Sequence, residues 1–244
     1  MDAPTRIAMW SGPRNISTAM MRSFEARGDA AVVDEPFYAA YLDRTGIDHP
    51  MRDEVIASQP RDPQVVASML LGPVPGGKPI WYQKHMTLHM LDEFGRDWMS
   101  QVRHAFLIRR PEAVLASYAL KRTKVTLADI GFVQQRELFE REAERSGAPP
   151  PVVDAADILA NPAAILERLC EALHIQYAPS MLRWTPGLRP TDGVWAPAWY
   201  QSVERSIGFE APQAKPAVPL PPQLQRLADE AQPHYEALRA HRLF

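Results

Sequence analysis

Two segments of this chain, far apart in the sequence, each combine a short apolar run, a turn and a helical pattern. Residues 6–24 read RIAMWSGPRNISTAMMRSF, and residues 104–118 read HAFLIRRPEAVLASY. A turn that leads from a buried strand into a helix places free backbone amides at the helix N-terminus, where they favour an anion. Two such segments in one chain predict a ligand that carries two separate anionic groups.

The remaining pattern alternates short apolar runs with helical periodicity. Such alternation is typical of a parallel sheet covered by helices. We expect a three-layer α/β/α fold with a central, mostly parallel sheet, similar to that of P-loop NTPases. The strands are predicted at residues 7–10, 30–33, 80–83, 105–108 and 152–153, and the helices at residues 17–27, 111–121, 134–145 and from 162 onward.

Proline divides the C-terminal region. Residues 1–211 are predicted to form one α/β domain, and residues 212–244 a proline-rich tether followed by a helix that packs on the same domain. That helix is expected to begin near residue 223 and to kink or restart at Pro233, because proline lacks the amide that continues a helix.

Composition narrows the function classes. The net charge is −2 and 46% of the 244 residues are hydrophobic, which predicts a well-packed core and argues against a broad surface for nucleic acid or membranes. No apolar run approaches the ~20 residues that a membrane helix needs. With Cys170 as the only cysteine and no visible secretory signal, we expect a cytoplasmic protein whose partner is a small molecule.

The loop from Gly12 to Thr18 stands where a phosphate-binding loop would stand, but it does not match the ATPase pattern G-x-x-x-x-G-K-[ST]. Ser17, Thr18 and Ala19 occupy the positions of the second glycine, the lysine and the hydroxyl. Without that lysine and a hydroxyl for magnesium, ATP hydrolysis by the usual route is not expected, and no metal is predicted.

The same loop resembles a different family. Pro13-Arg14-Asn15-Ile16-Ser17-Thr18 is similar to the P-R-S-G-[ST]-T loop of sulfotransferases that use 3′-phosphoadenosine 5′-phosphosulfate (PAPS), although Asn15 and Ile16 replace Ser and Gly. Arg109-Arg110-Pro111 with Ser117 resembles the R-x-P-x-x-x-x-x-S pattern of that family. The resemblance implies that Gly12, Pro13, Arg14, Asn15, Ile16, Ser17 and Thr18 bind the 5′-phosphosulfate of PAPS, and that Arg109 and Ser117 bind its 3′-phosphate.

Sulfuryl transfer also needs a base for the acceptor proton and a cation on the leaving oxygen. Arg14 is the candidate cation. His85 is the first candidate base, because residues 83–88 resemble the K-x-H-x-P-L segment that carries the base in cytosolic sulfotransferases. Glu35, in an E-P-F element similar to one in some bacterial sulfotransferases, is the alternative. His89 could pair with His85 on a metal, but no third ligand is evident.

The resemblance therefore predicts a PAPS-dependent enzyme that sulfates a hydroxyl or amine of a small acceptor. Two alternatives stay open: a divergent P-loop phosphotransferase, and a non-catalytic nucleotide-binding protein. Residues 193–209 are rich in aromatic residues and glycine, and they are interpreted either as a lid over the site or as a surface segment. The sequence leaves open the acceptor and the oligomeric state, a homodimer included.

Overall fold

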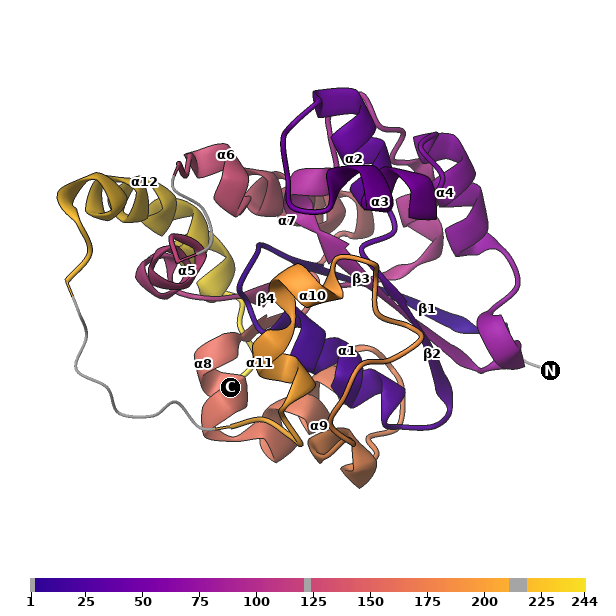
Figure 1. The fold of residues 1–244 in the computed structure, drawn as a ribbon. Coiled ribbons are helices and arrows are strands. Elements are labelled where there is room, and N and C mark those ends of the chain that lie inside the picture. Colours follow the sequence, from indigo (N-terminus) through magenta and orange to yellow (C-terminus); the bar gives the residue numbers. More distant parts are fainter. Residues whose placement is uncertain (1–2, 121–123, 211–218) are drawn as a thin grey trace.

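The computed structural model describes residues 3–120, 124–210 and 219–244. Its centre is a five-stranded sheet in the order β2-β3-β1-β4-β5, and all of its pairings are parallel (Figure 1). The strands are β1 (Thr5–Ser11), β2 (Ala30–Asp34), β3 (Ile80–Met86), β4 (Arg103–Ile108) and β5 (Val152–Asp154).

Helices connect the strands. The α-helices are α1 (Ser17–Glu25), α2 (Tyr38–Thr45), α3 (Arg52–Ser58), α4 (Pro63–Leu71), α5 (Pro111–Tyr118), α6 (Leu127–Ile130), α7 (Phe132–Ser146), α8 (Ala155–Ala160), α9 (Pro162–Ala172), α10 (Ala196–Trp199), α11 (Gln201–Glu204) and α12 (Pro222–Arg239). Short 3₁₀ helices are η1 (Pro75–Gly77), η2 (Thr87–His89), η3 (Asp97–Gln101) and η4 (Pro179–Leu182).

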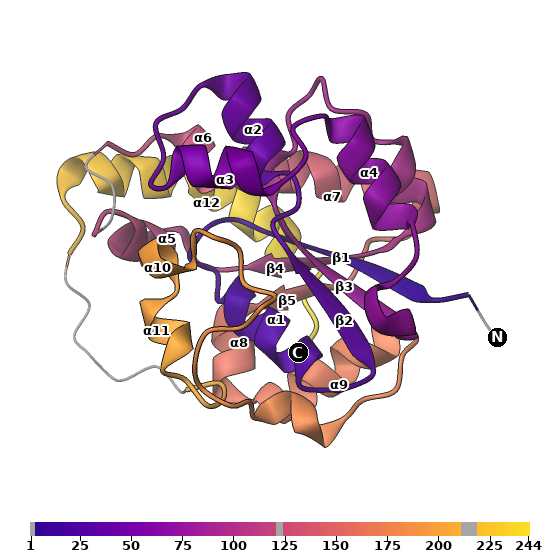
Figure 2. The same ribbon diagram turned by 45° about the vertical axis from the view of Figure 1, so that its right-hand side comes forward.

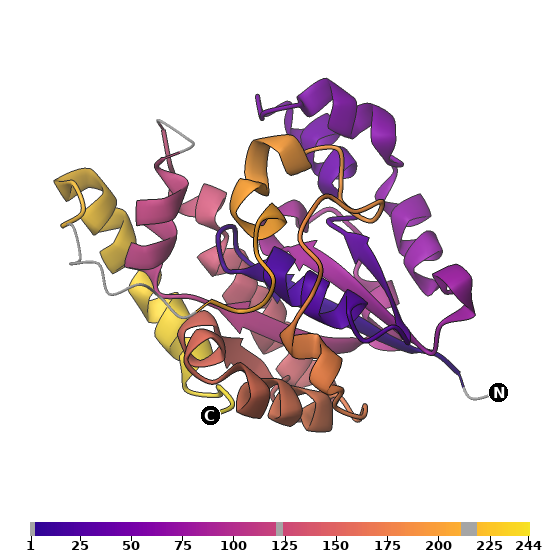
Figure 3. The ribbon, with the colours of Figure 1, turned by 60° about the horizontal axis from the view of Figure 1, so that its bottom comes forward.

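Alternate residues of the central strand β1 pack into two different hydrophobic cores, one on each face of the sheet. In β1, Ile7 and Met9 pack with side chains of α1 and α9, whereas Ala8 and Trp10 pack with side chains of α4, α7 and α12. Figure 2 and Figure 3 show the sheet between these two layers of helices. Successive side chains of a strand point to opposite faces, so a central strand with two buried faces is apolar throughout. The predicted three-layer α/β/α fold is confirmed.

The structure excludes one of the two predicted effects of Pro233, a restart of the C-terminal helix. Helix α12 continues through Pro233 without the predicted restart. It packs against α5 and α7, and the Tyr235 hydroxyl donates a 2.6 Å hydrogen bond to Asp154 at the end of β5. The predicted proline-rich tether lies largely outside the described residues. The helix predicted at residues 111–121 is α5, which ends at Tyr118, and residue 121, its predicted end, also lies outside the described residues.

The strand order brings the two predicted anion-binding turns together. The chain places β3 on one side of β1 and β4 on the other, so that the loops after β1 and β4 leave the sheet side by side. Ligands of open α/β sheets bind in the crevice at such a reversal of strand order. Within the described ranges, no helix has the length and apolarity to cross a membrane.

Candidate functional site

A pocket of about 350 Å³ opens at the carboxyl ends of the strands. Its walls come from the loops after β1, β2 and β4, from the end of β3 and from residues 195–210. The described residues that line it include Pro13, Arg14, Asn15, Ile16, Ser17, Thr18, Glu35, Tyr38, His49, Lys84, His89, Arg109, Trp195, Trp199 and Tyr200. The pocket therefore unites segments that are more than 180 residues apart in the sequence.

The loop after β1 is held in an unusual backbone conformation. Arg14 and Ile16 have positive φ angles of 61° and 57°. Alternating left-handed residues can turn backbone amides toward one side and form a concave surface of the kind that binds anions, and this pair lies at the start of α1. Ile16 adopts this conformation where the resembled family loop has glycine, and a β-branched residue there stores strain of about 1–3 kcal/mol.

Side chains fix the same loop from behind. Asn15 is buried, and its amide donates a 3.2 Å hydrogen bond to the carbonyl of Leu107 in β4. A Cβ added to Gly12 would lie 2.7 Å from the carbonyl oxygen of Ile130, so only glycine fits against that neighbour. Asn15 thus ties the β1 loop to the β4 strand, and it is one of the residues that line the pocket.

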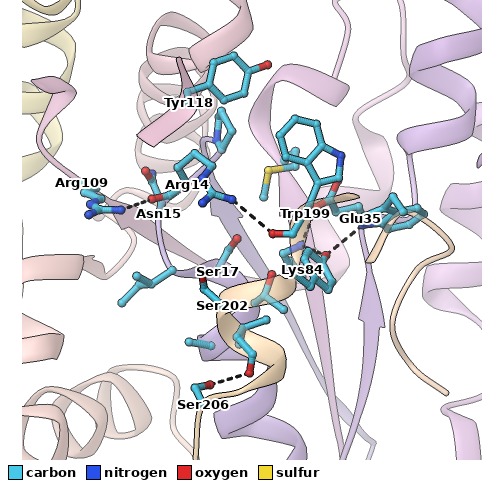
Figure 4. Close-up of a pocket in the computed structure, with 18 of the residues that line it drawn as sticks. Arg14, Asn15, Ser17, Glu35, Lys84, Arg109, Tyr118, Trp199, Ser202 and Ser206 are labelled. Atoms are coloured by element: carbon cyan, nitrogen blue, oxygen red, sulfur yellow. Dashed lines mark hydrogen bonds and ion pairs between the residues drawn. The ribbon is translucent and has the colours of Figure 1, made fainter. Parts of the chain in front are cut away.

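The two predicted anion-binding elements meet in this pocket. The Arg109 guanidinium donates a 2.6 Å hydrogen bond to the Arg14 carbonyl, and the Arg14 Nε donates a 2.9 Å bond to the Ser117 hydroxyl. Figure 4 shows both arginines on one side of the pocket. Burial lowers the pKa of both guanidinium groups from the ordinary arginine value, but arginine stays charged in proteins. Two fixed cations therefore face the same pocket.

A buried charge cluster lies on the other side of the pocket. Lys84 Nζ lies 2.7 Å from Asp34 Oδ1, 2.6 Å from Glu35 Oε1 and 2.7 Å from the Tyr200 hydroxyl. That hydroxyl donates to Asp34 Oδ2 and accepts from the Trp195 indole. Lys84 is only 1% exposed, so this network, and not solvent, satisfies its charge.

The cluster shifts the proton affinity of its members. Burial raises the pKa of Glu35 above its ordinary value, against the attraction of Lys84. Burial lowers the pKa of Lys84, but the carboxylates of Asp34 and Glu35 outweigh it and keep that pKa well above the ordinary lysine value. Lys84 is therefore a permanent cation, whereas Glu35 is a carboxylate whose pKa is moved toward neutrality. A base is most effective when its pKa lies near the working pH.

The structure separates the two candidate bases. Glu35 follows β2 in a strained turn with a φ of 41° and lines the pocket. His85 is not among the described residues that line it. The His85 ring stacks on Trp10 at 4.5 Å between ring centroids, and burial together with His104 lowers its pKa to about 3. Neighbouring residues of a strand face opposite sides, so Lys84 faces the pocket and His85 the aromatic core.

Residues 193–210 form a covering segment over the pocket. Tyr200 anchors it through Lys84 and Asp34, and the Gly193 amide donates to Asp34 at 3.1 Å. The carbonyl of Trp199 accepts a 3.4 Å hydrogen bond from Arg14 (Figure 4). Of the two interpretations of this segment, the lid agrees better with these contacts, because they join it to both sides of the pocket.

Three functional candidates were not predicted from the sequence: Lys84, Tyr200 and the pocket-facing role of His89. Lys84 was visible as the neighbour of His85, and strand alternation could have placed the two on opposite faces. Tyr200 lies 116 positions after Lys84 in the sequence, and no local pattern predicts that the two residues are in contact. Among the described residues, no three His, Cys, Asp or Glu side chains are placed to hold a metal ion.

Comparison with known proteins adds a family and a fold. Residues 5–242 match the family model described as "Sulfotransferase domain". Two curated relatives from Arabidopsis thaliana are named branched-chain-amino-acid aminotransferase-like proteins 1 and 2, and they are 37% and 36% identical over 99% and 96% of this chain. The chain spans only 43% and 41% of the length of those two relatives.

Two solved structures have the same fold. A sulfotransferase from Alicyclobacillus acidocaldarius aligns over 100% of this chain and 98% of its own, with a TM-score of 0.53 and 11% identity. A sulfotransferase domain from the curacin biosynthetic pathway aligns over 95% of this chain and 99% of its own, with a TM-score of 0.51 and 16% identity. At such identities the similarity concerns the chain fold and not the chemistry of the site.

Proposed function

We propose, from the premise that this chain belongs to the sulfotransferase domain family, that it moves a sulfuryl group from PAPS to a small acceptor. One observation carries the proposal: Arg14 and Arg109, from the two separate anion-binding elements, line one pocket and are joined by a 2.6 Å hydrogen bond. PAPS carries a phosphosulfate at one end and a 3′-phosphate at the other, which matches two anion-binding elements.

The residues around the pocket suggest a role for each end of the donor. The concave loop from Pro13 to Thr18 would hold the phosphosulfate with its amides, and Arg14 would stabilise charge on the leaving phosphate oxygen. Arg109 and Ser117 would hold the 3′-phosphate. Ser117 accepts a 2.9 Å hydrogen bond from Arg14, so its hydroxyl lies beside one of the two cations.

Glu35 is the better candidate for the base, because it lines the pocket while His85 packs against Trp10. In the transfer, the acceptor oxygen forms a bond to sulfur and the bond between sulfur and the bridging phosphate oxygen breaks. The electron pair of that bond leaves with adenosine 3′,5′-bisphosphate, and the acceptor proton passes to Glu35.

Thermal unfolding with nucleotides tests the donor. A ligand at one hundred times its dissociation constant adds about 2.7 kcal/mol of stability, which in a chain of this size is a rise in Tm of about 5–11 °C. Adenosine 3′,5′-bisphosphate should give that rise at concentrations where ADP does not. Arg109→Ala should abolish the difference, while Arg110→Ala, a neighbouring arginine whose side chain is 67% exposed, should keep it.

The same assay identifies the alternatives. Stabilisation by ATP with magnesium, and not by the 3′-phosphorylated nucleotide, would indicate a phosphotransferase. Binding of the 3′-phosphorylated nucleotide without any turnover of labelled PAPS would indicate a non-catalytic nucleotide-binding protein. Where turnover is found, its loss in Glu35→Gln and its retention in His85→Asn would assign the base, and the opposite result would restore His85.

A further inference from the structure

The pocket has a cationic side and an aromatic side. Arg14 and Arg109 lie together at one side, and Glu35 lies at the other (Figure 4). Ring contacts group the aromatic residues near Glu35: Tyr38 lies against Trp195 at 5.0 Å and against His89 at 4.4 Å between centroids. We call Glu35, Tyr38, His89 and Trp195 the acceptor subsite, because the cations suited to the donor lie on the other side.

His89 is a positioned imidazole with a free edge. The residue is 3% exposed, and its ring lies between those of Tyr38, at 4.4 Å, and Tyr41, at 4.8 Å between centroids. Its Nδ1 has no hydrogen-bond partner among the described residues, and it lies 3.9 Å from Glu35 Oε2. This distance is too long for a direct hydrogen bond, but a single oxygen atom can lie within hydrogen-bond reach of both groups.

The charge on His89 is settled by its surroundings. Burial, and then His49 and Lys84, lower the His89 pKa well below the ordinary histidine value, so that the ring is neutral. A neutral imidazole carries one N–H and one unprotonated nitrogen. With the proton on Nδ1, His89 is a donor beside the Glu35 carboxylate, which is an acceptor. The free Nδ1 is a buried polar atom, and a ligand group that pairs with it removes the cost of leaving it without a partner.

We propose that the reacting group of the acceptor is a hydroxyl that bridges Glu35 and His89, on a molecule that carries no negative charge. The inference rests on the proposed function, because it identifies the acceptor of the same site. The hydroxyl donates its proton to Glu35 Oε2 and accepts from His89 Nδ1–H. Its second lone pair then attacks sulfur, the sulfur–oxygen bond to the phosphate breaks, and the proton passes to Glu35.

The number of protons and lone pairs on the reacting atom explains why the subsite selects a hydroxyl. A hydroxyl oxygen has one proton and two lone pairs, so one lone pair remains for attack after the other has accepted from His89. A neutral primary amine has one lone pair. If that pair accepts from His89, none remains for sulfur. The pair of groups at Glu35 and His89 therefore favours an alcohol or phenol over an amine.

The charge balance excludes an anionic acceptor. Among the described residues that line the pocket, Lys84 is the cation nearest to Glu35, and Asp34 and Glu35 already contact it at 2.7 and 2.6 Å. Two carboxylates and one ammonium leave the cluster with one negative charge. Arg14 and Arg109 are taken up by the nucleotide in the proposed function, and Lys84 is already paired. A carboxylate or phosphate on the acceptor would therefore be desolvated beside this cluster without a cation of its own, which is strongly unfavourable.

Four matched probes test the inference. They are 4-ethylphenol, tyramine, 3-(4-hydroxyphenyl)propionate and 4-ethylaniline, which share one ring and differ in charge or in the reacting group. Binding is measured calorimetrically to the full chain saturated with adenosine 3′,5′-bisphosphate. We expect 4-ethylphenol and tyramine to bind at least tenfold more tightly than the carboxylate, and 4-ethylphenol at least threefold more tightly than 4-ethylaniline.

Variants of His89 separate hydrogen bonding from packing. His89→Phe keeps a ring between the two tyrosines but removes the donor, so 4-ethylphenol should bind about three- to tenfold more weakly, to the level of 4-ethylaniline. His89→Asn, whose side-chain amide can stand in for Nδ1, should restore much of the difference. The affinity for adenosine 3′,5′-bisphosphate, measured on the same samples, should be unchanged in both variants, because the proposed nucleotide site lies on the other side of the pocket.

Each other outcome has a definite meaning. Three results would show that the acceptor inference is wrong while the donor proposal stands. The carboxylate or the aniline binds as tightly as 4-ethylphenol, none of the four probes binds the nucleotide-saturated protein, or His89→Phe leaves the affinity for 4-ethylphenol unchanged. If the wild-type chain does not bind adenosine 3′,5′-bisphosphate at all, the proposed function itself fails.

Discussion

Replacing Lys84 by methionine is the sharpest test of the charge cluster. The side chain is 1% exposed, and its ammonium contacts Asp34, Glu35 and the Tyr200 hydroxyl at 2.6–2.7 Å. Methionine has nearly the same length, so it removes the charge and leaves little empty space. Two buried carboxylates then lose their cation. Removing one partner of a buried ion pair costs about 3–5 kcal/mol, and we expect a loss of that size in the free energy of unfolding at pH 7.

The loss should depend on pH in a defined direction. The pKa of Glu35 is already raised by burial in the folded protein, and removing Lys84 removes an effect that lowers it. The folded state of Lys84→Met therefore binds protons more readily than the unfolded chain. A group of this kind destabilises the folded state more as the pH rises above its unfolded pKa. The difference between Lys84→Met and wild type should thus be larger at pH 7 than at pH 5.

Urea unfolding at the two pH values measures both effects. Arg44→Met is the matched control, because Arg44 forms a 3.9 Å pair with Glu93 in which both side chains are more than half exposed. Such a surface pair contributes less than about 1 kcal/mol. A loss in Lys84→Met no larger than that of the control, or a loss that is equal at pH 5 and pH 7, would refute the view that Lys84 neutralises a buried acidic pair.

Three further predictions concern single groups. Gly12→Ala should lower the free energy of unfolding by about 1–3 kcal/mol and weaken nucleotide binding, because the new Cβ would lie 2.7 Å from the Ile130 carbonyl oxygen; unchanged urea midpoint and affinity would contradict this. Tyr235→Phe should cost about 2 kcal/mol and lower the Tm by about 4–8 °C in calorimetry, since the buried Asp154 loses a 2.6 Å partner; a shift below 1 °C would show that α12 contributes little here. If Glu35 is the base, kcat/KM should fall as the pH drops through a pKa above the ordinary glutamate value, and an acid limb near pH 3 would point instead to the other candidate.

Local sequence patterns determined the five strands and the helices α1, α5, α7, α9 and α12. Short apolar runs bounded by glycine, proline or charged residues predicted all five strands, and β2, predicted at 30–33, ends at Asp34. The turn chemistry likewise marked both loops that we propose to bind anions and the position of Glu35 after a strand. These features are local, because hydrophobic periodicity and the conformational limits of glycine and proline act over a few neighbouring residues.

Only the tertiary structure decided how the site is assembled. Both faces of β3 are buried, so alternation separates Lys84 from His85 but does not say which of them faces the pocket. The folded structure settled that, because Lys84 lines the pocket and His85 does not, and the pairing of β1 with β4 brought Arg14 within hydrogen-bond distance of Ser117. Tyr200 reaches Lys84 from a distant segment. Such contacts depend on strand pairing and chain crossing between remote segments, which no local pattern of residues encodes.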